Sequence, residues 1–146
     1  MSAIRTATVK WSGDLAKGRG TVTADSSGAY KDLAVTWASR VENADGRTSP
    51  EELLASAHAS CFAMALSFGL GNAGTPPESL EVTATVTFEQ VTGGFKVKSS
   101  ALAVKGKVPK LDAAGFEKAA QSAKDGCPIS QALKGNVELS VQAKLL

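Results

Sequence analysis

Three residues can carry nucleophilic or redox chemistry in this chain: two cysteines and the only histidine. His58 and Cys61 lie in one long apolar stretch, and Cys127 follows much later, directly before Pro128. A thiolate is a strong nucleophile, and two thiols that meet in the fold can exchange into a disulfide. The function therefore depends on how the fold places these side chains.

The two cysteines occupy different local settings. Cys127 is expected at the N-cap of a short helix that begins at Pro128, where helix-terminus amides favour a thiolate. Cys61 lies among apolar residues in the middle of a helix, which should raise its pKa and leave it inert. A buried free cysteine often acts as a small hydrophobic residue, so Cys61 becomes a nucleophile only if a cation reaches it.

Three arginines are candidates for that cation: Arg19, Arg40 and Arg47. An arginine aimed at a thiolate needs to be held, and a carboxylate binds a guanidinium with two hydrogen bonds. Glu51 is available for this role. It is equally explained as a first-turn acid that favours the helix dipole, and the spacing does not choose between the two interpretations.

His58 precedes Cys61 by three residues and shares its helical face. A Cys–His nucleophile pair is one interpretation. We favour a hydrogen-bonded core histidine, since a rigid buried helix gives the ring little freedom and no Asp or Asn partner is evident. One histidine and two distant cysteines do not make a metal ligand set.

The helix that carries these residues has a clear start. Ser49 is expected as N-cap, Pro50 at the first helical position and Glu52 as the reciprocal member of a capping box. The helix should run for about 20 residues, or roughly 30 Å, to Gly69 or Gly71. It is apolar nearly all round, which is typical of a helix buried on every side.

The rest of the chain predicts an α+β fold with an antiparallel sheet, the long buried central helix and a second, C-terminal helix. Asp112 should cap that second helix, and a parity change near Ser99 and Ser100 predicts a β-bulge. A short helix should follow at 129–133. One subunit with about six short strands would not easily surround the central helix, so we favour a homodimer over a monomer whose second helix covers the first. Alternating residues predict strands at 5–12, 21–24, 33–37, 80–88, 95–104 and 137–145.

Composition narrows the class of protein. The 146 residues, 43% of them hydrophobic, suit a single domain over 1–146. A net charge of +2 with scattered basic residues argues against nucleic-acid binding. We expect no signal peptide and no membrane span, because His58 and several serines interrupt the apolar helix. Two cysteines are too few for a disulfide framework and fit a cytoplasmic protein.

The stretches Thr48–Leu53, Ala57–Phe62 and Ala123–Gln131 together resemble the OsmC/Ohr family of osmotically inducible and organic-hydroperoxide-resistance proteins. The OsmC branch is the more similar, through Lys10–Asp14 and the Ala-His-Ala and Cys-Pro-Ile-Ser-Gln motifs. The resemblance implies a thiol peroxidase for organic and, more weakly, inorganic hydroperoxides, in an intertwined homodimer with interface sites. It assigns Cys61 as the peroxidatic cysteine, Cys127 as the resolving cysteine and Glu51 as the carboxylate that orients an arginine.

The resemblance leaves two arginines. In the OsmC branch the arginine that the carboxylate orients follows the third strand, which fits Arg40. In the Ohr branch this arginine lies in the N-terminal loop, which Arg19 in Gly-Arg-Gly matches. We choose Arg40 and keep Arg19 as the alternative. No bound cofactor is implied. An external dithiol, for which the family suggests a dihydrolipoyl group, would reduce the Cys61–Cys127 disulfide.

Two other classes of function remain open. A Cys61–His58 hydrolase or transferase would not need Cys127. A non-catalytic redox sensor or hydrophobic-ligand-binding protein on the same scaffold would form the disulfide without sustained turnover. The apolar neighbours Leu54, Phe62 and Met64 would suit an alkyl tail.

Overall fold

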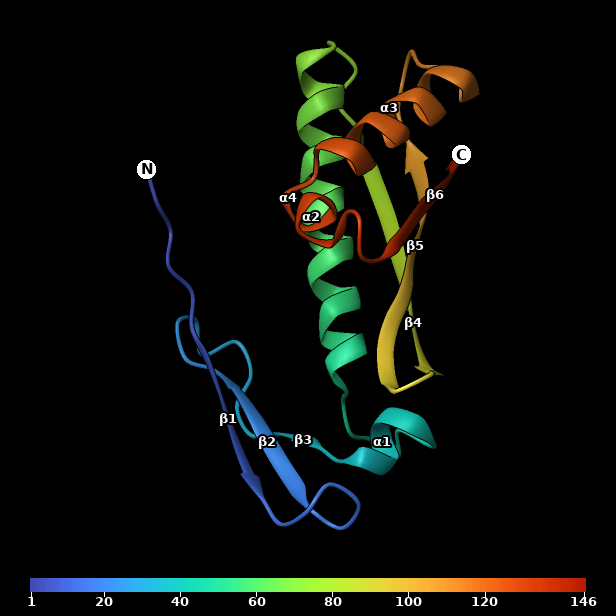
Figure 1. Ribbon diagram of the computed structural model, residues 1–146. Coiled ribbons are helices and arrows are strands. Elements are labelled where there is room, and N and C mark those ends of the chain that lie inside the picture. Colours follow the sequence, from blue (N-terminus) through green and yellow to red (C-terminus); the bar gives the residue numbers. More distant parts are fainter. The chain divides into compact units, whose positions relative to one another are not determined.

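The computed structural model describes residues 1–146 and confirms the α+β class (Figure 1). The chain forms two compact units, Met1–Leu53 and Leu54–Leu146. Each unit contains one three-stranded sheet. The helix α2 (Pro50–Asn72) begins in the first unit and continues into the second.

The first unit contains an antiparallel sheet of β1 (Ala7–Ser12), β2 (Arg19–Ala24) and β3 (Leu33–Val35), in that order. Every residue of β1 is exposed, including Val9 and Trp11, although the alternation along this strand is typical of a half-buried strand. This sheet therefore presents apolar side chains to solvent in the single chain.

The third strand is shorter than its alternation indicates. Trp37 was expected to continue the strand but instead opens the helix α1 (Trp37–Val41). Thr36 is the reason, because its hydroxyl accepts from the N–H of Ser39 while the Ser39 hydroxyl accepts from the N–H of Thr36. This reciprocal cap ends the extended backbone and starts a helix.

The second unit is built on β4 (Ser79–Val91), β5 (Gly94–Lys107) and β6 (Glu138–Leu145). β4 and β5 form the expected hairpin, and the bulge lies at Lys98, since Thr87 pairs with Ser99 and Phe88 pairs with Val97. The predicted bulge is thus confirmed to within a residue.

β6 corrects the expectation of a purely antiparallel sheet, because it pairs parallel to β5. The chain leaves the end of β5 through α3 (Ala113–Gly126) and α4 (Pro128–Leu133) and returns to the level of Ser99, inside that strand, where β6 starts. A crossover through helices, unlike a hairpin, returns the chain in the same direction.

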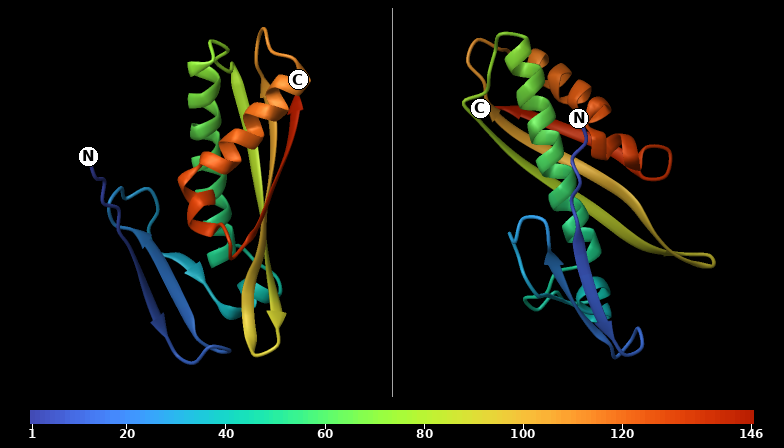
Figure 2. Two further views of the ribbon diagram at one scale, coloured as in Figure 1. Left: turned by 45° about the horizontal axis from the view of Figure 1, so that its top comes forward. Right: turned by 90° about the vertical axis from the view of Figure 1, so that its left-hand side faces the viewer.

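The core of the second unit lies between its sheet and the helices α2 and α3, as Figure 2 shows. Phe116 on α3 packs so closely on β5 that a Cβ at Gly106 would overlap its ring, which explains the glycine. The fully or nearly buried apolar residues of this core include Phe62, Leu66, Leu70, Leu102, Val104, Phe116 and Ala120.

The long helix departs from the expectation of burial on every side. One stripe faces the core, at His58, Phe62, Leu66 and Leu70, which are spaced four residues apart. The opposite side is open, with Met64 and Phe68 at 71% and 72% exposure. By length and composition α2 could cross a membrane, and 22% of its most apolar window is buried. Its core-facing stripe packs against the sheet, as in a globular protein.

Candidate active site

The two cysteines meet in the second unit. The Sγ atoms of Cys61 on α2 and Cys127 at the N-cap of α4 lie 2.9 Å apart, which is longer than a disulfide bond, and both thiols are free. Cys127 is fully buried, whereas Cys61 is half-buried. A partly accessible thiol therefore lies against an enclosed one.

The start of α4 explains how Cys127 is held. The Cys127 N–H donates to the carbonyl of Ala123 at the end of α3, and Pro128 opens the next helix. The side chain of Gln131 adds a hydrogen bond to the carbonyl of Asp125. The Gly-Cys-Pro sequence thus forms the sharp turn between the end of α3 and the start of α4, and the Cys127 thiol lies at this turn.

Burial raises the pKa of the Cys61 thiol, as the sequence predicts, and its hydrogen bond with Cys127 raises it further. A hydrogen bond from the backbone of Ile129, on α4, acts in the opposite direction and lowers it. The net direction is upward, so within the second unit the thiol is favoured over the thiolate. A cation would be needed to reverse this.

Glu51 and Arg40 form a partly buried ion pair in the first unit. Arg40 Nε donates to both carboxylate oxygens of Glu51 at 3.1 Å, and a terminal nitrogen donates to Oε1 at 2.8 Å. The side chains are 29% and 10% exposed. The guanidinium also lies 5.9 Å from the centre of the Trp37 ring. Arg40 is held by a carboxylate and an aromatic ring.

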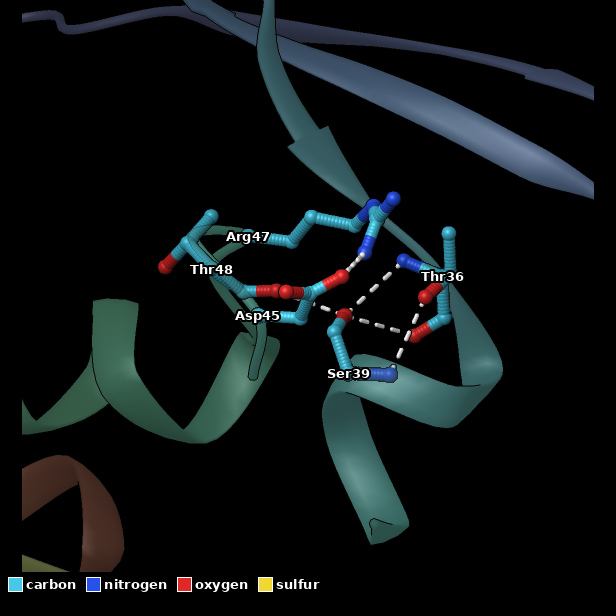
Figure 3. A network of polar contacts seen from close by, with 5 residues as sticks. All are labelled: Thr36, Ser39, Asp45, Arg47 and Thr48. Carbon is cyan, nitrogen blue, oxygen red and sulfur yellow. Dashed lines mark hydrogen bonds and ion pairs between the residues drawn. The ribbon is translucent and has the colours of Figure 1, made fainter. Parts of the chain in front are cut away.

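Contacts of Ser39 and Thr48 hold together the two backbone segments that carry Arg40 and Glu51; Figure 3 shows Ser39 and Thr48. The Ser39 hydroxyl lies 3.0 Å from the carbonyl of Thr48, so the residue before Arg40 is tied to the segment before Glu51. The Thr48 N–H donates to the carbonyl of Ala34, which fixes the same segment to β3. Ser49 then caps α2 as expected, with its hydroxyl accepting from the N–H of Glu52. The Thr36-x-x-Ser39 pattern is typical of a helix cap, and the interpretation of the sequence missed it.

Arg19 and Arg47 differ from Arg40. Arg19 is the exposed first residue of β2 and no carboxylate pairs with it in the structure. It lines a pocket of about 490 Å³ in the first unit with Lys10, Lys17 and Arg47. Arg47 pairs instead with Asp45 at 2.9 Å (Figure 3). Of the three candidates, Arg40 is therefore the one that pairs with Glu51.

His58 is a buried, hydrogen-bonded histidine, as we favoured from the sequence. Its Nδ1 lies 2.7 Å from the hydroxyl of Ser100 on β5, and its Nε2 lies 2.8 Å from the hydroxyl of Ser130 on α4. Burial lowers the pKa of His58 below its ordinary value. The sequence interpretation missed both serines, although Ser100 shares the inward parity of Leu102 and a buried hydroxyl needs a partner.

Two of the residues that were expected to contact an alkyl tail differ in their exposure to solvent. Phe62 is fully buried in the core, and Met64 lies on the open side of α2.

The described residues include no cluster of three or more side chains suited to a metal ion.

Residues 43–142 match the model of the OsmC-like protein family. The chain belongs to the OsmC family. It is 43% identical to Peroxiredoxin OsmC of Escherichia coli over 134 residues, which covers 92% of each protein. It is 31% identical to Organic hydroperoxide resistance protein OhrA of Bacillus subtilis over 113 residues, or 76% of this chain and 77% of that protein.

A solved structure of the OsmC/Ohr fold agrees. The organic hydroperoxide resistance protein OhrB of Bacillus subtilis superposes with a TM-score of 0.75 and 28% identity, over 95% of this chain and 98% of that one. An organic hydroperoxide resistance protein from Elizabethkingia anophelis has a TM-score of 0.76 at 24% identity, which supports the fold alone. The resemblance found in the cysteine and glutamate motifs is thus confirmed at the level of the family.

Proposed function

We propose that this chain is a thiol-dependent peroxidase that reduces organic hydroperoxides and, more weakly, hydrogen peroxide. The observation that carries the proposal is the pair of free sulfurs 2.9 Å apart, one half-buried and one enclosed. The relatives are named as a peroxiredoxin and as organic hydroperoxide resistance proteins, which supports the same reaction class.

The reaction begins at the half-buried thiol. The Cys61 thiolate attacks the terminal peroxide oxygen, the O–O bond breaks, and the remaining alkoxide takes a proton and leaves as an alcohol. Cys61 is then a sulfenic acid. The Cys127 thiol attacks its sulfur, the hydroxyl leaves as water, and a Cys61–Cys127 disulfide forms. An external dithiol, for which we propose a dihydrolipoyl group, exchanges twice with this disulfide and restores both thiols. No bound cofactor takes part.

Arg40 and Glu51 are proposed to supply the charge that the reaction needs. The pKa of Cys61 is raised by its own surroundings, so a guanidinium close to the sulfur would favour the thiolate. Glu51 accepts two parallel hydrogen bonds from Arg40, at Oε2 from Nε and at Oε1 from a terminal nitrogen, and limits where the guanidinium can point. Arg19 remains the alternative source of the charge.

We propose that the active unit is a homodimer with sites completed across the interface. Glu51 and Cys61 are separated by about 15 Å along one helix at about 1.5 Å per residue, too far to share one guanidinium easily. Two α2 helices packed antiparallel about a two-fold axis would bring Glu51 of one copy to Cys61 of the other. The exposed Met64 and Phe68 on α2 are apolar side chains that such a partner would cover.

The deciding experiment is peroxide consumption with dihydrolipoamide as reductant. We expect many turnovers with cumene or tert-butyl hydroperoxide and slower turnover with hydrogen peroxide. Stoichiometric disulfide formation without turnover, with any dithiol, would favour the redox sensor or ligand-binding protein instead. The free thiols suit a reducing compartment, and we propose a cytoplasmic location.

The hydrolase is not proposed, because both ring nitrogens of His58 are engaged by serine hydroxyls. A general base would need one nitrogen directed at the nucleophile.

A further inference from the structure

His58, Ser100 and Ser130 form a buried hydrogen-bonded triplet that the proposed reaction does not use. Their exposed fractions are 0%, 0% and 2%. They come from α2, β5 and α4, so the imidazole links three elements that are far apart in the sequence. We call this triplet the histidine clamp.

The clamp lies beside the cysteine pair. His58 precedes Cys61 by three residues on α2, and Ser130 follows Cys127 by three residues on α4. The hydrogen bond from His58 to Ser130 therefore joins the same two helices as the contact between the two sulfurs. Ile129, whose backbone hydrogen-bonds the Cys61 sulfur, is adjacent to Ser130.

Hydrogen bonds attach α4 to its two neighbouring helices, α3 and α2. It is six residues long. The N–H of its N-cap, Cys127, and the side chain of Gln131 bond to α3, at Ala123 and Asp125, and the backbone of Ile129 bonds to the Cys61 sulfur on α2. Two side-chain contacts join α4 and its N-cap to α2: His58 with Ser130, and Cys61 with Cys127. A helix of this length is not stable by itself and takes its position from such contacts.

We infer that His58 is a positioning residue for disulfide closure: through Ser130 it holds α4 so that Cys127 stays against Cys61. The contact to Ser100 anchors the imidazole on β5 but does not reach α4. Losing the Ser130 contact should let α4 sample positions in which the two sulfurs are apart. The pair then forms a disulfide less readily, whichever oxidant supplies the reaction.

The inference rests on the proposed function only in taking a peroxide as the oxidant. Formation of the Cys61–Cys127 disulfide can be measured without a peroxide. In a glutathione redox buffer, one oxidised glutathione accepts two electrons and two protons from the thiol pair. The pair becomes the Cys61–Cys127 disulfide, and two reduced glutathione molecules leave. The oxidised fraction, read by mass spectrometry after acid quenching and alkylation, gives the effective concentration of one thiol at the other.

Ser130→Ala and Ser100→Ala form the matched comparison, since each removes one hydroxyl from the same ring. One buried hydrogen bond is of modest net strength, so Ser130→Ala should lower the effective concentration about fivefold to tenfold. A tenfold loss would move the potential of this two-electron couple by about 30 mV toward easier reduction. Ser100→Ala should stay within about twofold of the unchanged protein, because its contact does not reach α4.

Two replacements of the histidine separate its nitrogens. The amide of Gln at position 58 reaches about as far as Nε2 and can keep the contact to Ser130, whereas the amide of Asn reaches only the Nδ1 position. His58→Gln should therefore restore closure, and His58→Asn should reproduce Ser130→Ala. Thermal unfolding of each variant shows whether it is folded, and the two serine variants decide the question if a His58 variant does not fold.

Three results would overturn the inference. One is an unchanged or increased effective concentration in Ser130→Ala. Another is an equal loss in Ser100→Ala, which would indicate a general loss of packing. The third is failure of His58→Gln to exceed His58→Asn when both are folded. Because glutathione replaces the peroxide, a protein that consumes no hydroperoxide would refute the proposed function and leave this test intact.

Discussion

Cys127 Sγ lies 2.9 Å from Cys61 Sγ, although 66 residues separate the two positions in the chain. The contact joins the middle of a long helix to the corner between two short ones. Of the two, only Cys61 is partly accessible, which fits the proposal that Cys61 reacts with the peroxide and Cys127 closes the disulfide.

The first prediction separates the roles of these thiols. Cys61→Ser should abolish peroxide reduction. Cys127→Ser should permit one turnover and accumulate sulfenic or more highly oxidised forms of Cys61, because no second thiol can displace the hydroxyl. Mass spectrometry after one equivalent of cumene hydroperoxide measures both. An unmodified Cys61 in the Cys127→Ser protein would contradict the assignment.

The second prediction concerns the held arginine. Arg40→Ala should slow the reaction of Cys61 with peroxide about 10-fold to 100-fold, since hydrogen bonds to a charged group contribute about 1.5–3 kcal/mol. Arg40→Lys should lose less, because it keeps the charge but not the planar fork. Arg19→Ala is the control and should have little effect.

A thiol titration in the Cys127→Ser background gives the pKa of Cys61 directly. Removing Arg40 should shift it upward, since a nearby cation favours the thiolate. The reaction rate should accordingly rise with pH until the solution passes this pKa, and the rise should extend to higher pH in Arg40→Ala. If only Arg19→Ala raises the pKa, the alternative arginine is the correct one.

The third prediction tests whether sites are shared between copies. Glu51→Ala and Cys61→Ser subunits should each be inactive alone. Mixed under conditions that exchange subunits, they should recover activity, because one site of the mixed dimer then has an intact Glu51 and an intact Cys61. Recovery is absent if each chain supplies its own complete set.

The fourth prediction addresses the open side of α2. Met64→Glu places a charge at a position that is 71% exposed in the single chain, so it should leave the fold of that chain intact. In a dimer the same charge would be buried without a partner, and sedimentation should shift toward the mass of one chain. Gln121→Glu, at an exposed position of α3, is the matched control and should sediment unchanged.

The fifth prediction uses the lowered pKa of His58. In the unfolded chain the imidazole takes a proton at its ordinary value of about 6.5. In the folded protein burial opposes the charge. The unfolded state therefore binds more protons below that pH, so the neutral imidazole contributes stability that is complete above about pH 6.5 and decreases as the pH falls.

Urea unfolding of the unchanged protein and of His58→Gln isolates this contribution. The free energy of unfolding of the unchanged protein should fall more steeply on acidification, by at most about 1.4 kcal/mol per pH unit for one proton. Carboxylates titrate in both proteins and cancel in the difference. Parallel pH profiles for the two proteins would show that His58 does not titrate on unfolding.

Much of the local structure follows from the sequence alone. Ser49 and Asp112 cap helices because their hydroxyl or carboxylate satisfies nearby N–H groups, and the parity change near Ser99 places the bulge. The position of Cys127 at a helix start follows from Pro128 in the same way. These features depend on residues a few positions apart, so a linear pattern contains the information.

The tertiary structure alone decided the pairings over long sequence distances. The contact between Cys61 and Cys127, the partners of His58 and the parallel pairing of β6 depend on how helices pack on the sheet. The ion pair between Arg40 and Glu51 depends on the turn through Ser39 and Thr48. The composition of α2 likewise does not show that one side of the helix is open. An all-apolar helix is predicted to be buried, whether its own chain or another molecule covers it.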